Sequence, residues 1–223
     1  MMKEIKAVAF DIDGTLYPDY KLNFLVIPHF LAHIYFFICY DIVRHQLRKH
    51  AQLQDLLVFQ SQLLAKKLHT TPKRAYEKTN EIIYKGLRPY FKIIKPFKYV
   101  TETFDAFKEA GLKLGVLSDF PTEQKGDIWG LAQKCDVVIG TEEIGALKPS
   151  RYTFGVFAEK LGCKPQEVLY VGNSKKNDIK GAKAAGMKTA FVMSPWRRLI
   201  HKKLSIADIS FSSYRQLQKI VLD

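Results

Sequence analysis

Two aspartates lie two residues apart in the stretch FDIDGTLY, directly after a short apolar run. Asp11 and Asp13 would stand together at the end of a buried strand, where like charges repel each other unless a cation is bound. Mg²⁺ prefers oxygen ligands and commonly takes one or two carboxylates, waters and substrate phosphate. One carboxylate at such a site can act as a covalent nucleophile and its neighbour as a general acid. An Asp-Gly turn after a strand is also common, so this motif alone leaves a purely structural interpretation open.

Further polar residues follow other apolar runs along the chain. Ser118 and Asp119 end the run LKLGVLSDF, Lys148 lies in GALKPS, and Asn173 and Asp178 lie in LYVGNSKKNDIKG. A serine hydroxyl and the next backbone amide can hold phosphate oxygens, and a fixed lysine can offset negative charge at a reacting phosphate. Each signal is weak by itself, since Ser is a common turn residue and Asp178 could instead cap a helix.

The elements that must position these residues are short strands alternating with helices. Apolar runs predict strands at 7–10, 112–117, 137–139, 168–171, 189–192 and 206–211. Helical stretches are expected between them, which predicts an α/β fold with a doubly wound parallel sheet and helices on both faces. The carboxyl ends of parallel strands meet at one edge of such a sheet, where ligands bind.

A long helical segment interrupts this alternation after the first strand. Residues from about 22 to 85 have helical character, with Thr71 and Pro72 as a helix start and Gly86 as a stop. We therefore divide the chain into a catalytic core, residues 1–16 and 97–223, and an inserted all-helical cap, residues 17–96. The insertion is expected to lie over the carboxyl ends of the strands.

The apolar strand followed by Asp-x-Asp-Gly-Thr-Leu resembles the first motif of the haloacid dehalogenase-like hydrolase superfamily, most of whose members are phosphatases. The resemblance extends over nearly the whole chain, because a Ser after a strand, a Lys-Pro and a late acidic motif follow in the family's order. It implies a Rossmann-like core with a helical cap of the first type. It also implies an Mg²⁺-dependent phosphohydrolase that acts on a small phosphate monoester through an aspartyl-phosphate.

Residue roles follow from the same resemblance. Asp11 would be the nucleophile, Asp13 the general acid and base, and Lys148 the catalytic cation. Phosphate would be held by Ser118, the backbone of Asp119, and Lys148. The metal ligands would be Asp11, Asp13, Asn173 and Asp178.

Two residues depart from the family pattern. Asn173 stands where a metal-binding Asp is usual, which removes one negative charge and should lower Mg²⁺ affinity. Asp119 stands where many relatives have Asn, and its carboxylate would have to point away from a bound phosphate. One alternative is therefore a catalytically weakened binding or regulatory protein on this scaffold. A haloacid dehalogenase is a lesser alternative, since Asp13 argues for a leaving group that needs a proton.

The charge and the cysteine content of the chain indicate which kinds of partner and compartment to expect. The chain of 223 residues carries a formal net charge of +13, and residues 17–98 hold 14 Lys/Arg against 5 Asp/Glu. This excess would attract a phosphorylated substrate, and we expect no nucleic-acid binding because no binding motif accompanies it. Three widely spaced cysteines and no signal-peptide pattern predict a cytoplasmic protein.

Residues 24–40 (FLVIPHFLAHIYFFICY) are unusually apolar. They are borderline in length for a membrane span, and a single crossing would separate motifs that must meet in one site. We expect no transmembrane span and a buried helix, with peripheral membrane contact or dimerisation as alternatives.

Overall fold

The computed structural model describes residues 4–50 and 52–223 and contains one parallel sheet with helices around it. In this part of the chain six strands pair in the order β3-β2-β1-β4-β5-β6. The strands are β1 (Ala7–Phe10), β2 (Lys113–Ser118), β3 (Val137–Gly140), β4 (Val168–Gly172), β5 (Lys188–Val192) and β6 (Ile209–Phe211). The predicted α/β class and all the predicted strands are confirmed.

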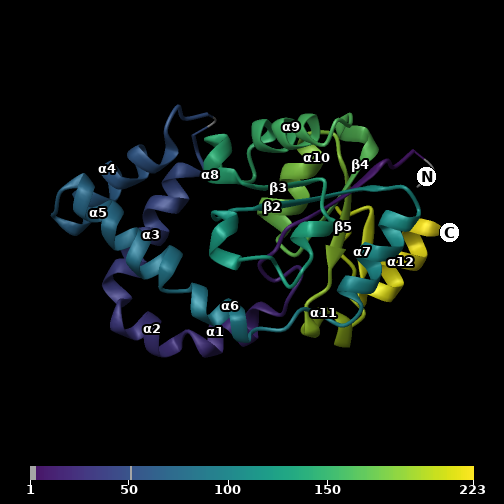
Figure 1. Ribbon diagram of the computed structural model, residues 1–223, viewed down its shortest axis with the longest axis horizontal. Coiled ribbons are helices and arrows are strands. Elements are labelled where there is room, and N and C mark those ends of the chain that lie inside the picture. The colour runs from purple at the N-terminus through teal and green to yellow at the C-terminus, as the bar shows by residue number, and fades with distance from the viewer. Residues whose placement is uncertain (1–3, 51) are drawn as a thin grey trace.

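Helices cover both faces of the sheet, as Figure 1 shows. In β1, Val8 and Phe10 pack towards one face with Phe104 of α7, while Ala7 and Ala9 pack towards the other face. This alternation follows from the two-residue period of a strand, and both faces are apolar because both are covered. The core helices are α7 (Val100–Glu109) and α12 (Tyr214–Leu222) on the first face, and α9 (Arg151–Lys160) and α10 (Gly181–Ala184) on the second.

The chain between β1 and β2 forms a helical insertion, which we define as residues 19–93. Its elements are α1 (Asp19–Leu25), α2 (Ile27–Ala32), α3 (Ile34–Leu47), α4 (Leu56–Leu68), α5 (Pro72–Thr79), a π-helical stretch (Asn80–Lys85) and α6 (Arg88–Ile93). Thr71 caps α5 as predicted, since its side chain accepts a hydrogen bond from the amide of Arg74. Val43, Leu64 and Ile83 are among the residues of a separate apolar cluster in the insertion.

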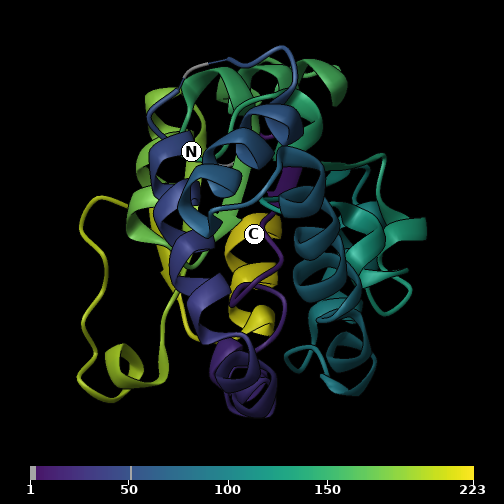
Figure 2. The same cartoon turned by 90° about the vertical axis from the view of Figure 1, so that its left-hand side faces the viewer.

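The insertion lies on one side of the core as a separate group of helices. It occupies the left half of Figure 1 and the front of Figure 2. The entering and leaving segments meet where the carbonyl of Leu16 accepts a hydrogen bond of 2.9 Å from the amide of Phe97. On this basis we propose a division into 1–16 plus 97–223 and 17–96.

The prediction of one buried helix over residues 24–40 is wrong. The segment is divided among α1, α2 and α3, with Pro28 in the first turn of α2. Neither α1 nor α2 buries a residue. Apolar side chains lie all around these helices, so only one stripe of α3, including Phe36 and Tyr40, can reach the apolar cluster of the insertion.

Two short helices complete the elements that border the sheet. They are α8 (Thr141–Ile144), directly after β3, and α11 (Pro195–Leu199), shortly after β5. No helix in residues 4–50 and 52–223 combines the length and the apolar character that a membrane crossing requires.

Candidate active site

Three neighbouring strands deliver polar residues to one edge of the sheet. Phe10 pairs in register with Val116 of β2 and with Val171 of β4. Asp11 therefore leaves β1 close to the places where Ser118 ends β2 and Asn173 follows β4. Asp11 is buried, and its Oδ2 accepts a hydrogen bond of 3.0 Å from the hydroxyl of Thr15.

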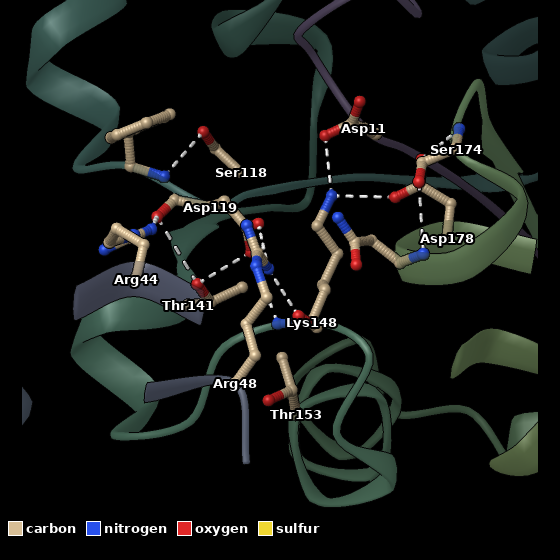
Figure 3. A network of polar contacts seen from close by, with 12 residues as sticks. Asp11, Arg44, Arg48, Ser118, Asp119, Thr141, Lys148, Thr153, Ser174 and Asp178 are labelled. Carbon is tan, nitrogen blue, oxygen red and sulfur yellow. Dashed lines mark hydrogen bonds and ion pairs between the residues drawn. The ribbon is translucent and has the colours of Figure 1, made fainter. Parts of the chain in front are cut away.

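Lys148 is the centre of the polar cluster at this edge. Its Nζ lies 2.6 Å from Oδ1 of Asp11 and 2.9 Å from Oδ1 of Asp178, so it bridges the two carboxylates, as Figure 3 shows. It also donates a hydrogen bond of 3.3 Å to the hydroxyl of Tyr170. All four residues are buried. The structure thus brings together one predicted nucleophile, the predicted cation and one predicted metal ligand.

The electrostatics of this cluster are unbalanced. The pKa of Asp11 is raised to about 7, because burial and the neighbouring carboxylates of Asp178 and Asp13 together outweigh the opposing effect of Lys148. Burial would lower the pKa of Lys148, but Asp11 and Asp178 outweigh it and hold the pKa well above its usual range. One buried ammonium therefore faces two buried carboxylates, and additional positive charge at this edge would relieve their repulsion.

Asp13 points to a different set of partners. Its carboxylate accepts a hydrogen bond from the hydroxyl of Tyr17 and forms an ion pair of 3.0 Å with Nζ of Lys125. The Lys125 ammonium is buried and lies 4.8 Å from the ring centroid of Phe91 in α6 and 5.0 Å from that of Phe120. The Asp13 side chain keeps 33% of its exposure, so it remains open to a bound molecule.

Ser118 and Asp119 form the turn that follows β2. The Ser118 Oγ accepts a hydrogen bond of 3.1 Å from the amide of Phe120. The Asp119 carboxylate lies 2.7 Å from the guanidinium of Arg48, the residue that follows α3, and accepts hydrogen bonds from the Thr141 hydroxyl and the Lys148 amide. Burial would raise the pKa of Asp119, but the nearby cations outweigh it and lower the pKa to about 2.

The carboxylate of Asp119 is thus kept ionised by cations of both the core and the insertion, first Lys148 and then Arg48 and Arg44. Its hydrogen bonds come from the Thr141 hydroxyl and the Lys148 amide, and we assign it no contact with phosphate. The backbone amide of Asp119 stays the predicted phosphate donor at this position. The side-chain pairing removes the repulsion that an extra carboxylate at this motif would otherwise cause.

Asn173 lies in the loop after β4, and Asp178 lies in a π-helical stretch (Lys175–Lys180) that leads into α10. Oδ2 of Asp178 accepts a hydrogen bond of 2.8 Å from the Ser174 amide, so Asp178 combines a structural bond with its ion pair to Lys148. A Cβ at Gly14 would lie 2.0 Å from the Asn173 side-chain amide, and Gly14 has φ of +75°. Glycine is therefore required there on two counts, and it allows Asn173 to approach the loop that carries Asp13.

These residues fit a hard cation by donor type. The carboxylates of Asp11 and Asp178 and the amide of Asn173 offer oxygen, which Mg²⁺ prefers, and one or two carboxylates are its usual protein complement. The unbalanced negative charge at the edge favours such an ion. Within the described residues no group of three or more His, Cys, Asp or Glu side chains is arranged as a metal site. A bound Mg²⁺ would therefore depend on water and substrate oxygens for its remaining ligands.

Several residues of the site region were missed by the sequence reasoning. Arg44 of α3 forms a buried ion pair with Glu142 of α8, and its guanidinium also donates to the Asp119 carbonyl at 2.6 Å. Tyr84 donates a hydrogen bond of 2.9 Å to the same Glu142. Burial raises the pKa of Glu142 even against the opposing effect of Arg44. No local pattern marks these pairs, since their members lie far apart in the chain.

A cavity of about 470 Å³ lies between the insertion and the core on the side of Asp13. Arg88 and Lys92 of the insertion and Lys125 of the core line it together with Glu123 and Asp127. The buried Lys125 joins this cavity to Asp13 through their ion pair. The cavity is large enough for a small metabolite, and its lining includes three cations.

Known proteins resemble this chain over most of its length. The family model described as haloacid dehalogenase-like hydrolase matches residues 8–192. A glyceraldehyde 3-phosphate phosphatase of Methanopyrus kandleri is 32% identical over 196 residues, which cover 83% of this chain and 82% of that protein. Pyrophosphatase PpaX of Halalkalibacterium halodurans is 28% identical over 192 residues, which cover 85% of this chain and 84% of that protein.

Solved structures show the same fold. The HAD phosphatase from Thermococcus onnurineus has a TM-score of 0.66 at 24% identity and covers 98% of each chain. The L-2-haloacid dehalogenase from Xanthobacter autotrophicus has a TM-score of 0.64 at 20% identity and covers 97% of this chain and 98% of its own. At these identities the likeness concerns the fold and does not choose between the two chemistries.

Proposed function

Since the chain belongs to the haloacid dehalogenase-like hydrolases, we propose that it is a phosphatase that hydrolyses a small phosphate monoester through a covalent intermediate on Asp11. The observation that carries this proposal is the buried Lys148, whose Nζ contacts both Asp11 and Asp178 at the carboxyl edge of the sheet. Relatives named as phosphatases over most of their length support the same chemistry.

In the first step the Asp11 carboxylate attacks phosphorus and the bond from phosphorus to the leaving oxygen breaks. For this step Asp13 must be protonated, which releases its ion pair with Lys125, and it gives that proton to the leaving oxygen, so the alcohol leaves neutral. Thr15 and Lys148 each hold one oxygen of Asp11, which fixes the orientation of the carboxylate before attack. The Ser118 hydroxyl and the backbone amide of Asp119 are the proposed donors to the phosphate oxygens.

In the second step water attacks the phosphorus of the aspartyl-phosphate and the bond from phosphorus to Asp11 breaks. Asp13, now ionised, takes the proton from that water, which restores both aspartates to their starting states. Lys148 offsets the negative charge of nucleophile and phosphate together throughout. Mg²⁺, which Asp11, Asp13, Asn173 and Asp178 would hold with water and phosphate oxygens, supplies further positive charge when it is bound.

The substrate would enter between the helical insertion, acting as a cap, and the core. The 470 Å³ cavity with Arg88, Lys92 and Lys125 is linked to Asp13 by the ion pair of Lys125, and we assign it to the leaving group of an anionic substrate. The names of the two relatives given above refer to different phosphate compounds, glyceraldehyde 3-phosphate and pyrophosphate. We therefore assign the substrate class and leave its identity to a screen of phosphorylated metabolites.

The test is hydrolysis of a generic aryl phosphate by the purified chain across a magnesium titration, with Asp11→Asn as the matched variant. The proposal predicts Mg²⁺-dependent turnover that falls by at least about a thousandfold in Asp11→Asn, because that variant loses the proposed nucleophile. Turnover retained in the variant would refute the covalent mechanism. No turnover on any phosphorylated compound at any magnesium concentration would favour a weakened binding protein, which is the function that Asn173 most directly suggests.

A further inference from the structure

An exposed apolar surface runs over the first two helices of the insertion. α1 and α2 bury no residue at all. Phe24 is 74% exposed and Leu31 is 60% exposed. The surface also includes Tyr20, Ile27, Phe30, Ile34, Tyr35 and Ile38, all exposed. Large exposed apolar patches on a protein surface mark a binding function, whereas single exposed apolar residues do not.

The surface continues across neighbouring elements. A hollow of about 560 Å³ is lined by Tyr20, Phe24 and Leu25 of α1, by Ile93 of α6 and by Lys95, among others. The apolar surface of α1 is therefore continuous, through this hollow, with the end of α6 and the segment that follows it.

Tyr20 also lines a second cavity, of about 220 Å³, together with Pro195 and Arg198 of α11. Trp196 and Leu199 of α11 are 67% and 71% exposed. In Figures 1 and 2 the purple helices α1 and α2 and the yellow-green α11 all reach the lower edge of the molecule. We call the surface formed by residues 18–38, 85–98 and 194–203 the basal face.

The basal face is strongly basic as well as apolar. Its three segments contain ten Lys or Arg and one acidic residue, Asp19. The cations are Lys21, Lys85, Arg88, Lys92, Lys95, Lys98, Arg197, Arg198, Lys202 and Lys203. Nine of the thirteen net positive charges of the chain therefore lie in these segments. Such an excess is not explained by solubility alone, because the cations interleave with large apolar side chains.

We propose that the basal face docks on the surface of an anionic lipid bilayer. Exposed Phe, Leu and Trp side chains can enter the boundary between headgroups and acyl chains, while Lys and Arg contact anionic headgroups. The positive charge of the basal face argues against a second copy of this chain as the partner that covers it. Two basal faces of nine net positive charges each would repel each other on contact.

The test is co-sedimentation of the full chain with vesicles of phosphatidylcholine, alone or mixed with phosphatidylserine. The wild type should bind the mixed vesicles at least about tenfold more tightly than the neutral ones, and added salt should weaken this binding. The double variant Phe24→Ser with Leu31→Ser should lose binding to the mixed vesicles at least about tenfold. Lys21→Glu with Lys95→Glu should do the same by reversing charge at the 560 Å³ hollow, which both lysines line.

Matched controls come from other surfaces of the molecule. Val58→Ser changes an exposed apolar residue of α4, and Lys160→Glu changes an exposed cation of α9. Both should bind vesicles as the wild type does. Circular dichroism melting should be unchanged in every variant, because all the replaced side chains are exposed.

Failure of the wild type to bind the mixed vesicles would overturn the proposal, and so would equal binding to neutral vesicles. Binding that the basal variants do not reduce would also overturn it. Sedimentation equilibrium without vesicles provides a separate check. A dimer that Phe24→Ser with Leu31→Ser dissociates would assign the basal face to a second copy instead. Neither readout requires hydrolysis, so the result is independent of the proposed phosphatase activity.

Discussion

Replacing Asp119 by Asn tests whether the surrounding cations, Lys148 of the core with Arg48 and Arg44 of the insertion, stabilise the carboxylate after β2. Asn has nearly the same shape and can still accept hydrogen bonds from the Thr141 hydroxyl and the Lys148 amide. The substitution therefore removes the charge that pairs with Arg48 while it preserves most of the local geometry. The free energy of unfolding should fall at pH 7.

The magnitude follows from the pKa of Asp119, which is lowered from 3.8 to about 2 in the folded chain. A group with a depressed folded-state pKa stabilises the protein fully above its unfolded pKa and loses this contribution as pH falls through the folded pKa. A difference of about 1.8 units corresponds to about 2.5 kcal/mol at neutral pH. By the same linkage about 1.3 kcal/mol of it remains at pH 3.

The assay is urea unfolding of the wild type and Asp119→Asn at a series of pH values from 7 downward, followed by circular dichroism. The difference between the two proteins should be constant from pH 7 to about 5 and should shrink below pH 4. Taking the difference cancels the many other carboxylates that titrate in the same range. Asp41→Asn, at an exposed position of α3, is the matched control and should show little difference at any pH.

Two results would refute the reasoning. A variant as stable as the wild type at pH 7 would mean that the cations around the Asp119 carboxylate contribute nothing to folding through its charge. A stability loss that does not change between pH 5 and pH 3 would mean that it comes from packing or from a hydrogen bond rather than from the carboxylate charge.

Two further predictions address the buried network and the metal. Glu142→Gln should lower the free energy of unfolding by about 3 kcal/mol in urea titrations, because it leaves the Arg44 guanidinium buried without its ionised partner. The double variant Arg44→Met with Glu142→Leu should recover part of this loss, and a single-variant loss below about 1 kcal/mol would contradict the prediction. Asn173→Asp should tighten Mg²⁺ binding by about tenfold or more in calorimetry, since it adds a negative ligand at the edge of the sheet. Unchanged Mg²⁺ affinity would place Asn173 outside the metal's reach.

The sequence predicted those parts of the structure that depend on local pattern. Apolar runs located the strands, and the strand ends then placed Asp11, Ser118 and Asn173 at one edge, because parallel strands end on the same side. Thr71 and Pro72 located a helix start because capping is a local interaction. The convergence of Asp11 with Asp178 followed from the sheet order rather than from any property of the two residues.

The parts that the sequence did not reveal depend on contacts over long separations. Arg44 meets Glu142 at a separation of 98 residues, and Lys125 reaches Asp13 across more than a hundred positions. A charge pattern along the chain cannot show such pairs. The failure for residues 24–40 is of another kind. Their apolar composition predicted burial. However, too few apolar residues of the rest of the protein pack against these helices, and most of their side chains remain exposed to solvent.

The pairs between insertion and core link the position of the insertion to the assembly of the site. Arg48 contacts the Asp119 carboxylate and the Lys148 carbonyl, so one side chain at the C-terminal end of α3 reaches the turn after β2 and the loop that carries the site lysine. Arg44 joins the same turn to α8. If the insertion moved away, water would reach the separated charges.

Such exposure would restore the hydration that burial removed, so opening would cost less than deleting one partner while the other stays buried. The ion pairs at this boundary can therefore hold the insertion against the core and still be separated at a moderate cost in free energy. An apolar boundary of equal area would lose its stabilisation on opening with no compensating hydration of charges. On this argument Arg44 and Arg48 hold the insertion against the core, and the apolar residues of α1 and α2 stay exposed on the outside of the molecule.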